Sequence, residues 1–231
     1  MKNYMIFMKK NIRNNMKKTA KLLCLFGLSL LMLSCNQQNN VTENQEINKE
    51  QIVVDNLMTR RSIRAYEDEI VPRDIMNVIL ECGIYAPNGM NKQPWEIRVV
   101  DDQNYIKELT DLYLSDMDDD HPRNPKKDPK FRNMFRNAPT VVFIAMEPGF
   151  CSQVDCGLLA GNMVNAAWGY GIGSCILMAP IQFMKSEKAK PYLDKLSFSE
   201  GYELLMAIGF GYPDESPQAE PRIYEKIKFI D

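Results

Sequence analysis

Hydrophobic and polar positions along this 231-residue chain follow helical and strand periods in turn. A short helix is expected at 50–59, and a second helix is expected from Pro72, because proline is common at the first helical position. On one face of that second helix the pattern places Ile75, Val78, Ile79 and Cys82.

The strand patterns lie further along the chain. Residues 95–100 alternate as a strand does, residues 140–146 are strongly apolar, and residues 202–210 are expected to form another buried strand. Helices are expected at 102–114 and 154–170. Strands separated by helices indicate an α/β or α+β sandwich.

Two familiar catalytic patterns are excluded by their context. The glycine-rich run at 169–175 closes a helix, whereas a dinucleotide-binding turn follows a strand and opens a helix. His121 is the only histidine and lies in the polar segment 115–130, which is either a mobile cover or solvated surface. A Ser-His-Asp hydrolase is therefore not expected, and no Gly-x-Ser-x-Gly elbow occurs.

The first 34 residues have the pattern of a secretory signal. They carry seven basic and no acidic side chains, and their apolar run at 22–33 is short for a membrane span, which needs about 20 residues. The sequence Leu-Ser-Cys at 33–35 resembles a bacterial lipobox, so residues 1–35 are expected to be a signal that ends at a lipidated Cys35. Translation from Met16 would shorten it. The alternative is a buried helix at 22–33 and an ordinary thiol.

The rest of the chain divides into a tether and one domain. Residues 36–50 are rich in Asn, Gln and Glu and are expected to be a flexible tether. Residues 51–231 suffice for one well-filled core. Residues 1–34 hold 7 of the 28 basic side chains, so 21 basic residues face 30 acidic ones in the remainder, a formal net charge of −9. This balance argues against general nucleic-acid binding.

Four cysteines fall in the predicted domain. Cys82, Cys156 and Cys175 lie among apolar or small residues, where a free cysteine is typically buried. Buried thiols are therefore favoured, and a disulfide between Cys151 and Cys156 is the alternative. No Cys-x-x-Cys pair or histidine cluster indicates a metal site.

A basic cluster at 60–66, Arg-Arg-Ser-Ile-Arg-Ala-Tyr, carries the first candidate chemistry. Guanidiniums present a rigid fork of donors that matches phosphate oxygens. The alternative is a solvated basic patch for acidic partners. Predicted helices on both sides place the cluster at a structural junction, which favours the phosphate site. A second polar turn, Ala-Pro-Asn-Gly-Met-Asn-Lys-Gln-Pro-Trp at 86–95, follows it.

With these two motifs and two further segments, the chain resembles the FMN-dependent nitroreductase family over nearly all of residues 51–231. The further segments are the helix at 155–169 with Asn162 and the run at 171–175, and then 208–213 with Pro221 and Arg222. Four motifs in this order are specific. The resemblance implies an α+β fold: a three-layer α/β/α sandwich with a mixed, mainly antiparallel central sheet, in an intertwined homodimer with two FMN sites between the subunits.

The resemblance also implies the site residues. Arg64 would approach the pyrimidine edge of the flavin, where a fixed cation favours reduction. The phosphate and ribityl end would be held by Arg60, Arg61 and Ser62, with Arg222 as a further cation. The ring would pack near Leu177 and Met178. The turn that reaches in from the partner subunit would contribute Pro87, Asn88, Gly89 and Asn91. Trp95 is interpreted as a core residue.

The implied activity is that of an FMN-dependent oxidoreductase, which passes electrons by a ping-pong cycle from NAD(P)H or another reductant to nitro, quinone or similar acceptors. Alternatives on the same fold are a flavin destructase or reductive dehalogenase, distinguished by the cover at 115–136, and a non-catalytic lipid-anchored flavin-binding protein. Anchoring on the periplasmic or cell-surface side would separate the enzyme from NAD(P)H. A quinol or redox protein would then be the donor, unless the tether faces another compartment or the signal is retained.

Overall fold

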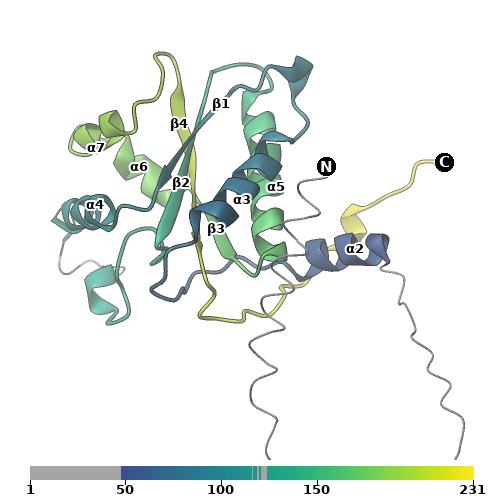
Figure 1. Ribbon diagram of the computed structural model, residues 1–231, viewed down its shortest axis with the longest axis horizontal. Helices are drawn as coiled ribbons and strands as arrows, with labels where there is room; N and C mark the ends of the chain where they lie inside the picture. The colour runs from purple at the N-terminus through teal and green to yellow at the C-terminus, as the bar shows by residue number, and fades with distance from the viewer. Residues whose placement is uncertain (1–47, 116, 119, 121–123) are drawn as a thin grey trace, which may run out of the picture. The chain divides into compact units, whose positions relative to one another are not determined.

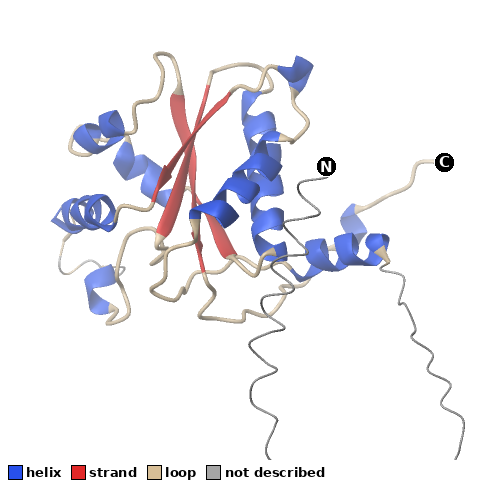
Figure 2. Ribbon diagram, viewed as in Figure 1, coloured by secondary structure: helices blue, strands red, loops and turns tan. Residues whose placement is uncertain are grey.

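The computed structural model describes residues 48–115, 117–118, 120 and 124–231, which form helices on both faces of a four-stranded sheet (Figures 1 and 2). This arrangement confirms the predicted three-layer α+β sandwich. The predicted signal at 1–35, most of the predicted tether at 36–50 and His121 lie outside the described residues. The last residues of that tether belong to helix α2 (Lys49–Thr59), which Asn48 caps by accepting from the backbone N–H of Gln51 at 3.0 Å.

The sheet has the strand order β1-β2-β4-β3, and every neighbouring pair is antiparallel. The strands are β1 (Trp95–Val100), β2 (Thr140–Met146), β3 (Gly173–Leu177) and β4 (Glu203–Gly211). Nearly all of β2 is buried, because helices cover both of its faces. The mixed character of the predicted sheet is limited to one parallel bridge between Ser62 and Ser174, at the free edge of β3.

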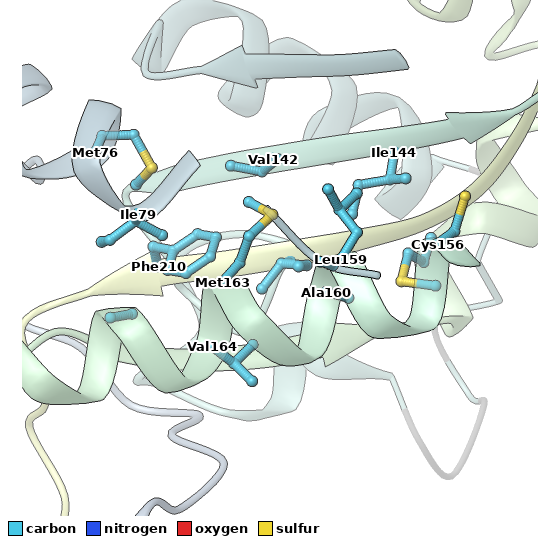
Figure 3. Packing of buried hydrophobic residues seen from close by; sticks show 14 of the residues in the cluster. Met76, Ile79, Val142, Ile144, Cys156, Leu159, Ala160, Met163, Val164 and Phe210 are labelled. Atoms are coloured by element: carbon cyan, nitrogen blue, oxygen red, sulfur yellow. The ribbon is translucent and has the colours of Figure 1, made fainter. Parts of the chain in front are cut away.

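Helices α3 (Arg73–Ile84) and α5 (Ser152–Gly169) cover one face of the sheet. Figure 3 shows Leu159 and Met163 of α5 directed toward the sheet, in one cluster with Ile79 of α3 and Phe210 of β4. Burial of such side chains is the main stabilising contribution to the fold.

The opposite face is covered by α4 (Gln103–Ser115), α6 (Ala179–Met184) and α7 (Lys190–Lys195) (Figure 2). Phe135, from the loop before β2, packs edge-to-face on Phe143 with ring centroids 5.6 Å apart. Helices α6 and α7 were not predicted, because six residues are too few to display a helical period. The sequence signal that could have revealed them is a proline in the first turn of each helix, Pro180 in α6 and Pro191 in α7.

The core-facing side of α3 differs from the prediction. Its buried residues are Met76, Ile79 and Gly83, whereas the predicted Ile75, Val78 and Cys82 are half-buried. The reason is the close approach of α5: a Cβ at Gly83 would lie 2.5 Å from Cγ of Met163, so α5 packs against the face of α3 that contains this glycine.

The four cysteines of the domain are free thiols, so the alternative of a bridge between Cys151 and Cys156 is wrong. Cys156 and Cys175 are buried as expected, whereas Cys82 is half-buried. In the part of the chain that the structure describes, no group of metal-ligating side chains occurs and no helix is long and apolar enough to cross a membrane.

Candidate functional site

The basic cluster runs along the free edge of β3. The backbone N–H of Ile63 donates to the carbonyl of Ser174 at 3.0 Å, and the side chain of Ile63 is buried against Gly173. A Cβ at position 173 would lie 2.9 Å from the Cβ of Ile63, so this contact requires glycine. Because Ile63 points inward, its extended neighbours Ser62 and Arg64 are directed away from the core.

A second set of backbone contacts holds the other side of the cluster. Glu67 donates to Tyr212 at 2.9 Å, Asp214 donates to Ala65 at 3.0 Å, and the Glu215 carboxylate accepts from the N–H of Arg64. The segment after β4 therefore fixes the backbone that carries Arg64. No motif pointed to Glu215, which lies in a polar C-terminal stretch of the chain.

The three guanidiniums of the cluster have different partners. Arg61 Nη1 donates to the carbonyls of Met58 at 2.8 Å and Arg60 at 2.9 Å, so Arg61 caps the C-terminal end of α2. Arg64 Nη1 donates to the carbonyl of Ser62 at 3.2 Å. No carboxylate side chain among the described residues forms a salt bridge with Arg60, Arg61 or Arg64. Their positive charge is available for an anion.

A cavity of about 840 Å³ opens beside Arg64. Its wall includes Cys175 and Leu177 of β3 and Met178, the residue after this strand. Burial raises the pKa of the Cys175 thiol, while the positive charges of Arg64 and Arg136 act in the opposite direction. The structure thus brings together the predicted cation Arg64 and the predicted ring contacts Leu177 and Met178.

The predicted turn, by contrast, lies far from the basic cluster within one chain. Gly89, in the short helical turn Gly89–Asn91, donates its N–H to Asp155 Oδ1 at 3.2 Å near the start of α5. The residue just before the basic cluster, Thr59, accepts a hydrogen bond from Trp168 Nε1 at 3.0 Å near the end of α5. Thirteen residues of helix separate these contacts by about 20 Å, and Figure 1 shows the two segments beside opposite ends of α5.

The same turn has an unusual backbone. Met90, Asn91 and Gln93 have positive φ angles of 53°, 53° and 50°. Such angles are uncommon outside glycine and cost energy, and they concentrate at binding and catalytic sites. Asn88 supports the conformation, because its Oδ1 accepts from the N–H of Gln93 at 2.9 Å. Pro87, Asn91 and Gln93 remain exposed at the surface.

The remaining predicted residues are placed as follows. Arg222 is exposed and donates to the carbonyl of Glu220 at 2.6 Å, and no hydrogen bond or ion pair between described residues joins it to the basic cluster. Asn162 donates to the carbonyl of Cys82 at 3.1 Å, which ties α5 to α3. Trp95 is buried in the core, as predicted.

The sequence profile of the nitroreductase family matches residues 57–212, which include the basic cluster, the turn and all four strands. The chain belongs to the nitroreductase family. A curated relative from Archaeoglobus fulgidus, named "Putative NADH dehydrogenase/NAD(P)H nitroreductase", is 26% identical over 165 residues, which cover 69% of this chain and 84% of the relative.

Solved nitroreductases have the same fold. A nitroreductase with bound FMN from Bacteroides fragilis superposes with a TM-score of 0.67 at 27% identity, covering 78% of this chain and 98% of that one. An FMN-dependent nitroreductase from Clostridium difficile gives a TM-score of 0.64 at 28% identity, covering 79% and 100%.

Proposed function

We propose that this nitroreductase-family chain is an FMN-dependent oxidoreductase that transfers electrons from NAD(P)H or another reductant to nitro, quinone or similar acceptors. One observation carries the proposal: the guanidinium of Arg64, which forms no salt bridge with a described residue, lines a cavity of about 840 Å³ that is also lined by Leu177 and Met178. Such a cavity suits a flat ring system joined to an anionic tail.

The residues present fit FMN by their chemistry. Arg60 and Ser62 would hold the phosphate and ribityl end, with Arg61 contributing the guanidinium nitrogens that the end of α2 leaves unused. Arg64 would stabilise the negative charge that reduction places on the pyrimidine edge. Leu177 and Met178 would cover the ring and exclude water. FMN, when bound, supplies the hydride and electron-transfer chemistry itself.

A homodimer would complete the site. The turn with Pro87, Asn88, Gly89 and Asn91 is about 20 Å from the basic cluster along α5, so it would contribute to the site of a partner subunit rather than its own. Exposed apolar residues support such an association, because a monomer rarely leaves so many uncovered. They include Val54 and Met58 on α2, Val154 and Leu158 on α5, and Phe229 and Ile230 at the C-terminus.

The first prediction concerns the visible spectrum of the purified full chain. We expect a bound flavin that shows oxidised FMN absorbance, loses it on anaerobic addition of a reductant, and regains it when a nitro or quinone acceptor is added. NADH, NADPH and a reduced quinone are compared as donors. A protein that neither retains flavin nor binds added FMN would contradict the proposed function. Bound flavin that no donor reduces would contradict the enzymatic activity and favour a non-catalytic flavin-binding protein.

We also propose that the chain is a membrane-anchored bacterial lipoprotein, with a signal at 1–35, a tether at 36–50 and the FMN-binding domain at 51–231. The basic and apolar pattern of the first 34 residues and the polar composition after Cys35 support it. The domain would then face the periplasm or cell surface, and a quinol or redox protein is the expected donor there.

The second prediction tests the anchor. Cys35→Ala removes the thiol that would be lipidated, so the protein is expected to move from the membrane fraction to the soluble fraction. Cys151→Ala changes an exposed cysteine of the domain and serves as the matched control, which should stay with the membranes. Unchanged membrane retention of the Cys35 variant would argue against lipidation.

A further inference from the structure

Arg136 is a second guanidinium at the cavity, outside the four family motifs. It lines the same cavity as Arg64, and its exposed side chain forms no hydrogen bond or salt bridge with another described residue. The charges of both arginines act on the thiol of Cys175, which lines that cavity too. Arg64 and Arg136 therefore approach the same part of the cavity from separate segments of the chain.

The backbone at Arg136 is held in an unfavourable conformation. Arg136 and Asn137 have φ angles of 60° and 67°, in the left-handed region that costs energy for residues other than glycine. Asn137 enforces this shape, because its Oδ1 accepts from the N–H groups of Arg132 at 2.7 Å and Asn133 at 3.1 Å. Asn133 Oδ1 in return accepts from the N–H of Asn137 at 3.1 Å.

The loop that carries Arg136 is also anchored to the protein on both sides. Phe135 is fully buried, and Arg132 donates to the carbonyl of Tyr66 and pairs with Asp68 at 3.2 Å. Tyr66 closes the basic cluster, so the loop is tied to the segment that positions Arg64. The strained backbone and these anchors give Arg136 a defined place at the cavity instead of a mobile surface position.

The cavity itself combines aromatic, apolar and positively charged walls. Tyr113, Phe131 and Met134 provide surface for a planar ring. Among its described lining residues Lys127 adds a third cation to the two arginines, whereas Asp128 is the one carboxylate. The net positive charge favours an anionic ligand, and a planar guanidinium binds a carboxylate with two parallel hydrogen bonds.

We propose that Arg136 determines acceptor specificity by binding the anionic group of a planar aromatic acceptor, such as an aromatic carboxylate. This inference rests on the proposed oxidoreductase function, in which Arg64 serves the flavin and Arg136 is left for the substrate. For a nitroaromatic carboxylate, the nitro group accepts two electrons from the reduced enzyme and two protons from the enzyme and solvent. The products are a nitroso group, which stays on the ring, and water. The carboxylate is unchanged and serves for binding.

The test uses the oxidative half-reaction, which is independent of the natural donor. The flavin of the full-length protein is reduced with dithionite without oxygen and mixed with 4-nitrobenzoate or with the neutral 4-nitrobenzamide. Arg136→Gln is expected to raise the half-saturating concentration of 4-nitrobenzoate about tenfold, as expected for the loss of one charge-assisted contact. The value for 4-nitrobenzamide is expected to change less than twofold, and Arg136→Lys should restore part of the preference.

Two further variants distinguish recognition of the carboxylate from general effects of charge and of folding. Lys130→Gln removes a charge from the same segment outside the cavity lining, so both half-saturating concentrations should stay within twofold of wild type. Arg136→Gly relieves the left-handed backbone, so it should keep or raise the melting temperature while it loses the preference for the carboxylate. Equal effects of Arg136→Gln on both acceptors would overturn this inference alone. Failure of both acceptors to reoxidise the flavin would overturn the proposed function as well.

Discussion

Phe135→Ala is expected to destabilise the protein by about 3–5 kcal/mol, the cost of removing a fully buried phenyl ring from a packed core. Phe135 has no exposed surface and packs edge-to-face on Phe143 of the central strand β2. Its carbonyl accepts from the N–H of Ala138 at 3.2 Å, so the same residue begins the turn that presents Arg136. A loss of this size lowers the melting temperature by roughly 10 °C in a domain of this length.

Thermal unfolding followed by circular dichroism measures this effect. Phe198→Ala, which removes the same atoms from a half-buried site, is the matched control and should cost clearly less. Phe135→Leu should recover most of the stability, because it preserves much of the buried volume. If Phe135→Ala unfolded at the temperature of the Phe198 variant, the ring would not anchor the loop.

The core that Phe135 belongs to was predictable in outline, because its elements are long and periodic. The strands at 95–100 and 140–146 have the predicted boundaries, and α5 begins two residues before the predicted 154. Their apolar residues are numerous and regularly spaced, so few other secondary structures would bury them. Helices α6 and α7 escaped prediction because six residues and one proline each are a weak signal compared with a full amphipathic period.

The candidate site was predictable only where motif residues are adjacent in sequence. The cluster at 60–64 indicated an anion site by its composition, and the structure places this cluster beside β3. The residue types could not reveal which guanidiniums already form hydrogen bonds within the protein. Arg61 caps the C-terminal end of α2, and this is visible only in its hydrogen-bond geometry. Arg136 was included in the predicted cover at 115–136, but no role was predicted for it. No sequence pattern indicates that residue 136 lies near residue 64 in the fold.

Backbone strain is the second property that residue types concealed. Positive φ angles are usually anticipated from glycine, yet Met90, Asn91 and Gln93 adopt them in one turn and Arg136 with Asn137 in another. In each turn an asparagine side chain compensates by accepting backbone hydrogen bonds, Asn88 in the first and Asn137 in the second. Both strained turns are parts of the proposed site, although one chain places the first of them far from the basic cluster.

That separation leads to the prediction with the largest effect on the cofactor. Arg60→Ala should weaken FMN binding about 10- to 100-fold, because a charge-assisted contact contributes about 1.5–3 kcal/mol. Arg222→Ala is expected to act in the same direction. Asn91→Ala should weaken binding about fivefold, the loss of one neutral hydrogen bond. The apparent dissociation constants follow from flavin fluorescence during titration of the apoprotein.

A heterodimer of two variants then shows which subunit supplies each contact. Chains carrying Arg60→Ala and Asn91→Ala are given different affinity tags, and only the mixed dimer is purified. If each site takes the basic cluster from one subunit and the turn from its partner, one site carries both substitutions and the other carries neither. Half of the sites should therefore bind FMN as tightly as wild type.

Intrachain sites would give a different result from the same heterodimer. Each site would then carry one substitution, and no site would keep wild-type affinity. A wild-type dimer with the same two tags controls for the tags and should keep all of its tight sites. Because the two contacts lie about 20 Å apart along α5 in one chain, we expect half of the sites in the mixed dimer to keep wild-type affinity for FMN. A monomeric protein that still binds FMN tightly would contradict the shared site.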